Sequence, residues 1–192
     1  DRSVSRGLGD VYKRQQNGLD PQKDLSIDQS IDFGSTAAAF AGDDSADFTV
    51  EFEPSATALE KEGTGHVVAS LGVESGYVPY TSYSAKTSYL KEYPDVIQKF
   101  TNGLQMGMEF VREHTPEEIA QVIASQFPET DMETLTTIVK RYHEQDTWKE
   151  NLIFEKESFE LLQDILEDAG ELSRRMPYEK LVTVEYAEKA AE

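Results

Sequence analysis

Two carboxylates and an aromatic ring stand side by side at the end of an alternating segment. In residues 46–54, with the sequence ADFTVEFEP, Glu51, Phe52 and Glu53 come directly before Pro54. Carboxylates accept hydrogen bonds from amino groups, and an aromatic face stacks on a flat ring or attracts a cation. These residue types predict a binding site for a small nitrogen-bearing molecule. Glu53 has two roles open to it, capping the following helix or accepting a hydrogen bond from a ligand.

Further candidate residues lie where a strand is predicted to end or a helix to begin. Open α/β sheets bind ligands beyond the C-terminal ends of their strands, where helix N termini also present unpaired N–H groups. Helix capping and turn formation are the alternative roles for the same residues. The predicted ligand-binding residues are Phe33, Gly34, Ser35, Glu51, Phe52, Glu53, Tyr80 and Thr81.

The patterns of common catalytic and metal sites do not occur in the sequence. Without cysteine the chain can form no disulfide, thiolate nucleophile or thiolate metal site. The histidines His66, His114 and His143 are far apart and lack the spacing of metal ligands. No G-x-S-x-G elbow, Walker loop or G-x-G-x-x-G sequence is found. We therefore predict no catalytic residues, no metal and no cofactor.

Composition narrows the class of partner. The 192 residues, 38% of them hydrophobic, suffice for one ordinary domain or for one and a half small lobes. A net charge of −19 repels nucleic acid and anionic membrane surfaces, so neither is predicted as a partner. No apolar run approaches the roughly 20 residues that a bilayer-spanning helix needs.

The first half of the chain has the pattern of an α/β fold. Apolar and polar residues alternate over 25–33 and 48–52, and 66–71 is apolar and β-branched, so three strands are predicted. Helices are predicted from Ser35 through Phe40 and from Pro54 to near Gly63. The order of strand, helix and strand favours parallel pairing with right-handed crossovers. Residues 77–85 are predicted to be extended, and Pro79 keeps them off the centre of a sheet.

The second half has helical periodicity. Apolar residues recur every three or four positions between Pro94 and His114, which predicts a long amphipathic helix. The sequence 115–118, Thr-Pro-Glu-Glu, has the form of a capping box and predicts another helix start. Two further helices are expected around residues 135–142 and 159–169, the latter ending at Gly170.

These patterns divide the chain into four parts. Residues 1–15 are more basic than the rest and show no apolar period, so they are either a non-native leader or a disordered native arm. Residues 16–76 form the α/β lobe, 77–85 a crossing, and 86–192 the helical part.

Several stretches resemble a known family of binding proteins. Residues 48–61 and 66–72, the sequence Gly-Tyr-Val-Pro-Tyr-Thr at 76–81, and the helical stretches 89–103, 117–128 and 178–190 resemble the substrate-binding proteins of ABC importers. The similarity is to the sulfonate, nitrate and thiamine-precursor group and covers nearly all of residues 17–192. It implies a type II periplasmic-binding-protein fold, whose two lobes close on a ligand by hinge motion.

The resemblance also implies that this chain is a C-terminal fragment. Residues 16–76 would be part of the second lobe, 77–85 the hinge crossing, and 86–192 the helical remainder of the first lobe. The front of the first lobe and its export signal would be missing, so we expect the 192 residues alone to bind ligand weakly or not at all. The implied protein is a monomer outside the cytoplasm, in the periplasm or anchored as a lipoprotein, and its partner is an ABC permease.

Charge favours one class of ligand. Between residues 17 and 87 there is no arginine whose guanidinium could bind an oxyanion through two hydrogen bonds. A pyrimidine-like molecule or an amine is therefore favoured over sulfonate or nitrate as the ligand. Helix N termini bind anions without a basic side chain, so an anionic ligand remains an alternative. Two other functions stay open, a pyrimidine-precursor synthase on the same fold and a ligand-sensing module of a signalling protein. The synthases carry a cysteine-rich motif, and its absence argues against an enzyme.

Overall fold

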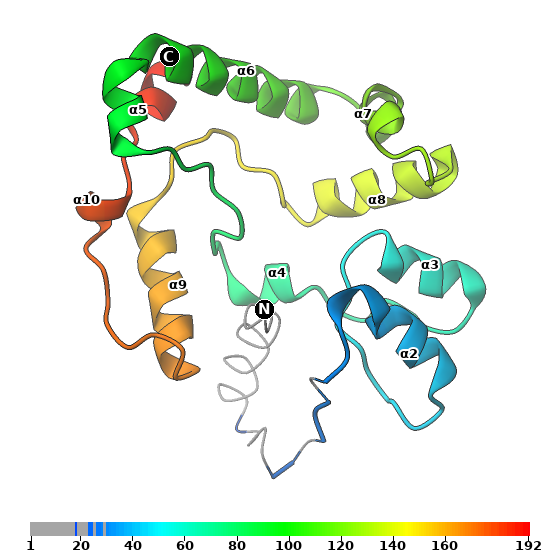
Figure 1. The fold of residues 1–192 in the computed structure, drawn as a ribbon. Helices are drawn as coiled ribbons and strands as arrows, with labels where there is room; N and C mark the ends of the chain where they lie inside the picture. Colours follow the sequence, from blue (N-terminus) through cyan, green and yellow to red (C-terminus); the bar gives the residue numbers. More distant parts are fainter. Residues whose placement is uncertain (1–17, 19–22, 25, 29) are drawn as a thin grey trace.

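The computed structural model describes residues 18, 23–24, 26–28 and 30–192. This part of the chain is built from helices joined by extended and turning segments (Figure 1). The helices in chain order are η1 (Phe33–Ser35), α2 (Thr36–Gly42), α3 (Ser55–Glu62), α4 (Leu71–Ser75), α5 (Thr87–Glu92), α6 (Pro94–Glu113), α7 (Pro116–Ile123), η2 (Ala124–Gln126), α8 (Met132–Glu144), α9 (Lys156–Asp168), α10 (Tyr178–Leu181) and α11 (Glu185–Ala190).

The core lies where α7 packs against α8. Ile119 and Ala120 of α7 meet Leu135 and Val139 of α8, and all four side chains are buried. Phe110 and Val111 from the end of α6, together with Trp148, complete the apolar contact. The ring of Trp148 thus serves to pack the core.

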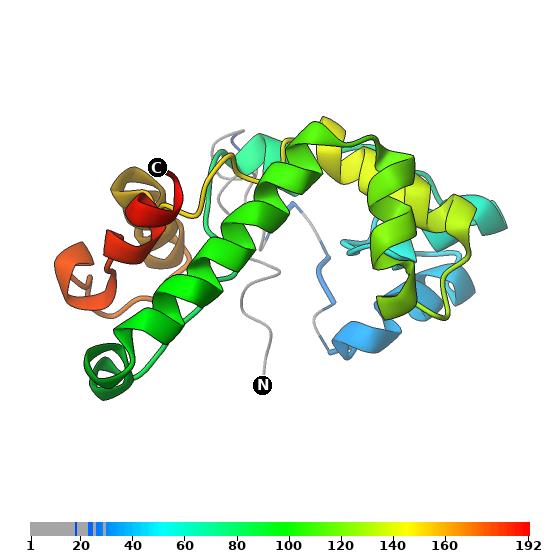
Figure 2. The same cartoon turned by 90° about the horizontal axis from the view of Figure 1, so that it is seen from above.

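The long helix α6 connects two groups of helices. At its N-terminal end lie α5 and the C-terminal helix α11, and at its other end the chain continues into α7 and α8 (Figures 1 and 2). Helix α3 lies between α2 and α8, whereas α10 contacts α9 on the opposite side of the molecule (Figure 1). None of the described helices has the apolar length that crossing a bilayer requires.

The predicted helix starts and ends are confirmed. The Glu118 N–H donates to Thr115 Oγ1 at 3.3 Å, and the Thr115 N–H donates to Glu118 Oε2 at 2.9 Å, which makes the capping box at the start of α7. Helix α6 begins at Pro94 as expected. Helix α3 ends at Gly63, whose φ of 72° is readily adopted only by glycine.

The predicted strands are wrong for the residues that the structure describes. Residues 46–52, 65–70 and 77–86 are extended or irregular, and no strand is assigned in the described ranges. Of the first predicted strand, 25–33, positions 25 and 29 lie outside those ranges, and residues 33–35 form η1 instead. An alternating sequence becomes a strand only when a neighbouring strand takes up its backbone hydrogen bonds, and these segments have no such neighbour in the described part.

The predicted domain division and the two-lobed fold remain predictions. The predicted α/β lobe is represented here by α2, α3 and α4 with extended connections, without the parallel sheet. The predicted leader, 1–15, lies outside the described residues. Residues 86–192 are helical, as the periodicity predicted.

Candidate ligand-binding site at the junction of α3 and α8

An exposed pair of aromatic rings lies at the start of α3. The rings of Phe52 and Tyr80 are 5.5 Å apart between centroids, with an angle of 46° between their planes. Phe52 comes from the end of the extended segment 46–52, and Tyr80 comes from the extended segment 77–86. Phe52 is 36% exposed and Tyr80 is 68% exposed. The Tyr80 ring is therefore largely exposed, and the Phe52 ring beside it is partly exposed.

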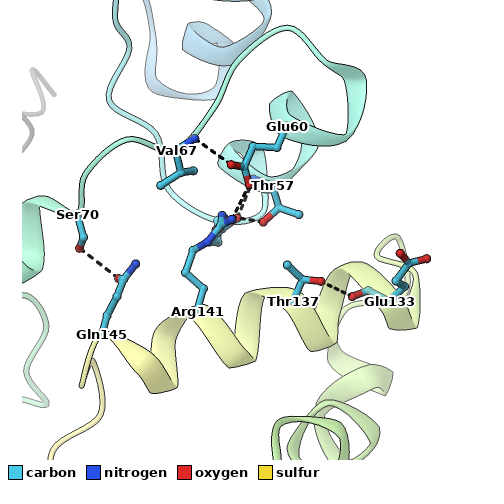
Figure 3. Close-up of polar contacts among 9 residues, drawn as sticks. Thr57, Glu60, Val67, Ser70, Glu133, Thr137, Arg141 and Gln145 are labelled. Atoms are coloured by element: carbon cyan, nitrogen blue, oxygen red, sulfur yellow. Dashed lines mark hydrogen bonds and ion pairs between the residues drawn. The ribbon is translucent and has the colours of Figure 1, made fainter.

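Arg141 of α8 binds three side chains in α3 and directly before it. Its Nη1 makes an ion pair with Glu53 and also donates to Thr57 Oγ1 at 3.1 Å. Its Nη2 donates to Glu60 Oε2 at 2.5 Å. Figure 3 shows the guanidinium reaching from α8 to Thr57 and Glu60 on α3. One arginine thus holds two carboxylates and a hydroxyl in the forked geometry that guanidinium favours.

The Glu53 carboxylate is the most enclosed charge of this junction. Its side chain is only 5% exposed, against 20% for Arg141. Besides the ion pair, Glu53 Oε2 accepts a hydrogen bond from the Thr57 N–H at 3.0 Å, within the first turn of α3. The carboxylate therefore caps α3, which is one of the two roles that the sequence left open. It also neutralises the charge of Arg141.

Hydrogen bonding shifts the pKa of Glu60. Its carboxylate accepts from the Val67 N–H at 2.9 Å and from Arg141, and these contacts lower its pKa, the Val67 bond most strongly (Figure 3). The pKa of Arg141 shifts in the opposite direction. Burial alone would lower the pKa of the guanidinium, but its bonds to the two carboxylates outweigh burial and raise it. Both partners are therefore charged at neutral pH.

Tyr142 adds a hydroxyl beside the ring pair. Burial raises the pKa of this hydroxyl most strongly. A hydrogen bond with the Glu53 backbone acts against burial, and the charge of the Glu53 carboxylate adds to it, so the pKa stays raised. Its ring meets Trp148 edge-on, with centroids 5.9 Å apart, which joins the site to the core. At neutral pH the Tyr142 hydroxyl is protonated and can donate a hydrogen bond.

A separate, open hollow borders Tyr77, at the start of the segment that carries Tyr80. Its volume is about 420 Å³, and its lining residues are Tyr77, Lys149, Glu155, Glu157, Ser158 and Leu161. Tyr77 Oη donates to Asp146 Oδ2 at 2.5 Å, and this bond raises the pKa of the tyrosine. Lys149 is held by the Ile153 carbonyl at 2.6 Å. None of the predicted ligand-binding residues lines this hollow, so it is not the predicted site.

The structure brings some of the predicted residues together. Phe52, Glu53 and Tyr80 meet at the junction, and Glu51 is half-buried beside them, with its Oε1 accepting from Thr49 Oγ1 at 2.9 Å. Gly34 and Ser35 are exposed in η1, at the start of α2, and Thr81 is exposed next to Tyr80. The side chain of Phe33 lies outside the described residues. The role of all eight residues in binding a ligand remains a prediction.

Two residues of the junction were missed by the sequence analysis. Arg141 and Tyr142 lie on α8, far along the chain from α3. Within α8, the sequence pattern predicts only a surface position for Arg141 and a position on the apolar face for Tyr142. Residues 17–87 contain no arginine, so an arginine that pairs with Glu53 and Glu60 had to come from elsewhere in the chain. Among the described residues there is no cluster of histidine or acidic side chains that could hold a metal ion.

The comparisons with known proteins point to binding. A Bacillus subtilis (strain 168) protein described as "Putative binding protein YtlA" is 39% identical to this chain over 178 residues, which are 93% of this chain and 53% of that protein. The chain therefore spans about half the length of this curated relative. Neither a protein-family model nor a solved structure matches the chain. This chain is thus similar to a described binding protein, whose description names no ligand.

Proposed function

We propose that this chain is part of an extracytoplasmic solute-binding protein that captures a small nitrogen-bearing ligand and delivers it to an ABC permease. The similarity to a described binding protein supports the binding role. The finer assignment, to importers of the sulfonate, nitrate and thiamine-precursor group, rests on the sequence resemblance. In this role the protein binds its ligand between two lobes, without catalysis, as a monomer.

The exposed ring pair is the observation that carries the proposal. Aromatic side chains of this size are usually enclosed, because each buries a large apolar area. Phe52 and Tyr80 come from separate extended segments, their ring centroids lie 5.5 Å apart, and their side chains are 36% and 68% exposed. Such a pair can take a flat heterocycle by stacking or a cation over the ring face.

The charges around the pair favour a neutral or cationic ligand. Arg141 brings a guanidinium to the junction, but both of its terminal nitrogens are taken up by Glu53, Glu60 and Thr57. Lys61 is held by Thr134 Oγ1 at 2.6 Å. These basic groups are therefore engaged, and the net charge of −19 repels an anion further. We propose a pyrimidine-like molecule or an amine, hydrogen-bonded by Glu51 and Tyr142 at the edge of the ring pair.

A thermal-shift screen of the full-length protein tests this function. A ligand that binds only the native state raises the melting temperature, by an amount that grows with its concentration relative to Kd. We expect pyrimidines or amines to raise it, and sulfonates and nitrate to leave it unchanged. A rise with sulfonates or nitrate alone would show that the ligand class is wrong.

Variants of the ring pair locate the site. Phe52→Ala and Tyr80→Ala should each weaken binding about tenfold, since a stacking or cation–π contact contributes about 1–2 kcal/mol. Tyr89→Ala is the matched control, because Tyr89 of α5 makes a similar ring pair with Tyr93, the residue directly after α5, at 4.8 Å. Equal ligand affinity in all three variants would place the site elsewhere.

The 192 residues alone should bind weakly or not at all, because the proposal places part of one lobe outside this chain. Titration of this chain with the ligand found in the screen checks the point. Binding as tight as that of the full-length protein would contradict the two-lobed arrangement and leave a one-sided site on α3 and α8.

A further inference from the structure

The open hollow bordered by Tyr77 and α9 has the size of a small-molecule site. Its volume is about 420 Å³, and sites for small molecules typically measure about 300–1,000 Å³. Its lining combines an aromatic ring and a leucine side chain with polar and charged groups, which are Tyr77, Leu161, Lys149, Glu155, Glu157 and Ser158. All six belong to this chain, and neither ring of the pair formed by Phe52 and Tyr80 is among them.

The Tyr77 ring is held at the hollow by its own chain. Tyr77 Oη donates to Asp146 Oδ2 at 2.5 Å, which ties the ring to the segment after α8. Directly before it, Gly76 has a φ of 80° and a ψ of −172°, a backbone conformation that essentially only glycine adopts. A Cβ atom at position 76 would lie 3.6 Å from Leu161 Cδ2, so the backbone here passes close to α9. The ring is therefore in position before a ligand arrives, and Tyr77 is still 69% exposed.

The basic group of the hollow is already neutralised. Lys149 Nζ donates to the Ile153 carbonyl at 2.6 Å and to Glu155 Oε1 at 3.3 Å. The charges of Lys149 and Glu155 therefore cancel, and two of the three N–H groups of the ammonium are used. An oxyanion would find a single N–H group of Lys149 left, beside a carboxylate.

The Glu157 carboxylate has no such partner. It makes no hydrogen bond and no ion pair with the residues that the structure describes. The neighbouring cation, Lys156, pairs instead with Glu179 at 2.8 Å. The Ser158 hydroxyl, which also lines the hollow, has no hydrogen-bond partner in the described part of the chain either. The hollow thus carries one uncompensated negative charge next to an unused hydroxyl and an aromatic ring.

These groups together fit an organic ammonium ion. A carboxylate accepts charge-assisted hydrogen bonds from an ammonium group, and the face of a tyrosine ring attracts a cation. A bare metal ion fits poorly, because the described residues contain no group of three side chains that could ligate it. An anion is repelled by Glu157 and by the net charge of −19.

We propose that this hollow is a second binding site, which takes a small organic ammonium ion with an apolar or aromatic body. The ammonium group pairs with Glu157 and donates to the Ser158 hydroxyl, while the body lies against Tyr77 and Leu161. The site goes beyond the proposed function, because it shares no residue with the ring pair and its lining requires no second lobe.

NMR titration of the isotope-labelled full-length protein with benzylamine tests the proposal. We expect saturable shifts of the amide signals of Glu157, Ser158 and Leu161, with a Kd of about 1 mM. Benzyl alcohol, which lacks the charge, should bind at least about threefold more weakly, and benzoate should not bind there. No saturable shift at these amides, or equal binding of the alcohol or of benzoate, would overturn the proposal.

Two further arms of the titration identify the site and the source of the ammonium group. The double variant Phe52→Ala/Tyr80→Ala should keep the shifts at the hollow. Shifts confined to the amides around Phe52 and Tyr80 would overturn this second site and leave the proposed function standing. Nα-acetyl-lysine amide, which carries the ammonium group of a protein side chain without a ring, should bind more weakly than benzylamine. Tighter binding of the lysine derivative would overturn the assignment to a free amine.

Variants of the lining separate charge from space. Glu157→Gln keeps the shape and removes the charge, so it should weaken benzylamine binding about threefold, as expected for an exposed ion pair. Glu171→Gln is the matched control, because Glu171 is an exposed glutamate beyond the end of α9 and does not line the hollow. Ser158→Phe fills the hollow while keeping Glu157, and it should abolish the saturable shifts. Wild-type affinity in either the Glu157 or the Ser158 variant would show that the amine binds elsewhere.

Discussion

Replacing Arg141 with methionine removes the cation that joins Glu53 and Glu60 to α8. The Glu53 side chain is 5% exposed, so the substitution leaves a buried carboxylate without its counter-charge. Breaking a buried ion pair in this way costs about 3–5 kcal/mol. Glu53 keeps its hydrogen bond from the Thr57 N–H, which places the loss near the lower end, about 3 kcal/mol. The pair with Glu60, 30% exposed, adds less than about 1 kcal/mol.

Urea unfolding followed by circular dichroism at neutral pH measures this loss as a decrease in the free energy of unfolding. Lys140→Met is the matched control, because Lys140 is the neighbouring residue of α8 and its ion pair with Glu144, at 3.9 Å, is exposed. The control should change the free energy of unfolding by no more than about 0.5 kcal/mol. A loss below about 1 kcal/mol in the Arg141 variant would refute the view that this arginine holds α3 in place.

The pH dependence of the same variant gives an independent check. The pKa of Glu60 is lowered in the folded state, first by the Val67 N–H and then by Arg141. A carboxyl group with a lowered pKa stabilises the fold above its unfolded pKa, and this contribution is lost as the pH falls through the folded pKa. The difference in stability between wild type and Arg141→Met should therefore narrow as the pH falls from 7 toward 3. A difference that widens at low pH would contradict the assignment.

Three further predictions concern the helical part. Thr115→Ala should lower the free energy of unfolding by about 1 kcal/mol in urea, because it removes the hydroxyl of the capping box at the start of α7, and a loss near zero would count against this cap. Ile119→Ala should lower the free energy of unfolding by about 2–4 kcal/mol in the same assay, because the Ile119 side chain is 2% exposed in the core. Ile119→Val should lower it by only about 1 kcal/mol. Equal losses in the two variants would place the side chain outside a packed core. Asp131 caps α8 through Thr134, whose hydrogen bonds lower the pKa of the carboxyl to about 2. The ionised Asp131 carboxylate stabilises the fold fully above its unfolded pKa, and this contribution is lost as the pH falls toward 2. Asp131→Asn should therefore flatten the dependence of the free energy of unfolding on pH between pH 4 and 2. An unchanged slope would show that Asp131 is not the source of this pH dependence.

The helices could be predicted because their signals are local. The capping box at Thr115, the proline at the start of α6 and the glycine after α3 each act within one turn, so the sequence around them determines the result. The strands could not be predicted in the same way. Alternation in residues 46–52 shows which face would be buried, but whether a strand forms depends on a neighbour that a local pattern does not contain.

The site was predictable in its residue types and not in its electrostatics. Phe52 and Tyr80 were both predicted to bind the ligand, and the structure pairs their rings. Arg141 was missed because it meets Glu53 across 88 residues of sequence. Such a contact is set by the packing of α3 on α8, which no short-range pattern records. A guanidinium is therefore present at the junction, but carboxylates occupy it, so the choice between an anionic and a neutral or cationic ligand does not rest on a lack of arginine alone.

Calorimetric titration of the full-length protein with the amine or pyrimidine that gives the largest thermal shift tests the central claim most directly. The account predicts saturable one-to-one binding to the wild type. It predicts affinity weaker by about a hundredfold for the double variant Phe52→Ala/Tyr80→Ala, because each ring contributes about 1–2 kcal/mol. Binding of the double variant with wild-type affinity, in a protein that melts at the wild-type temperature, would contradict the claim that this ring pair holds the ligand.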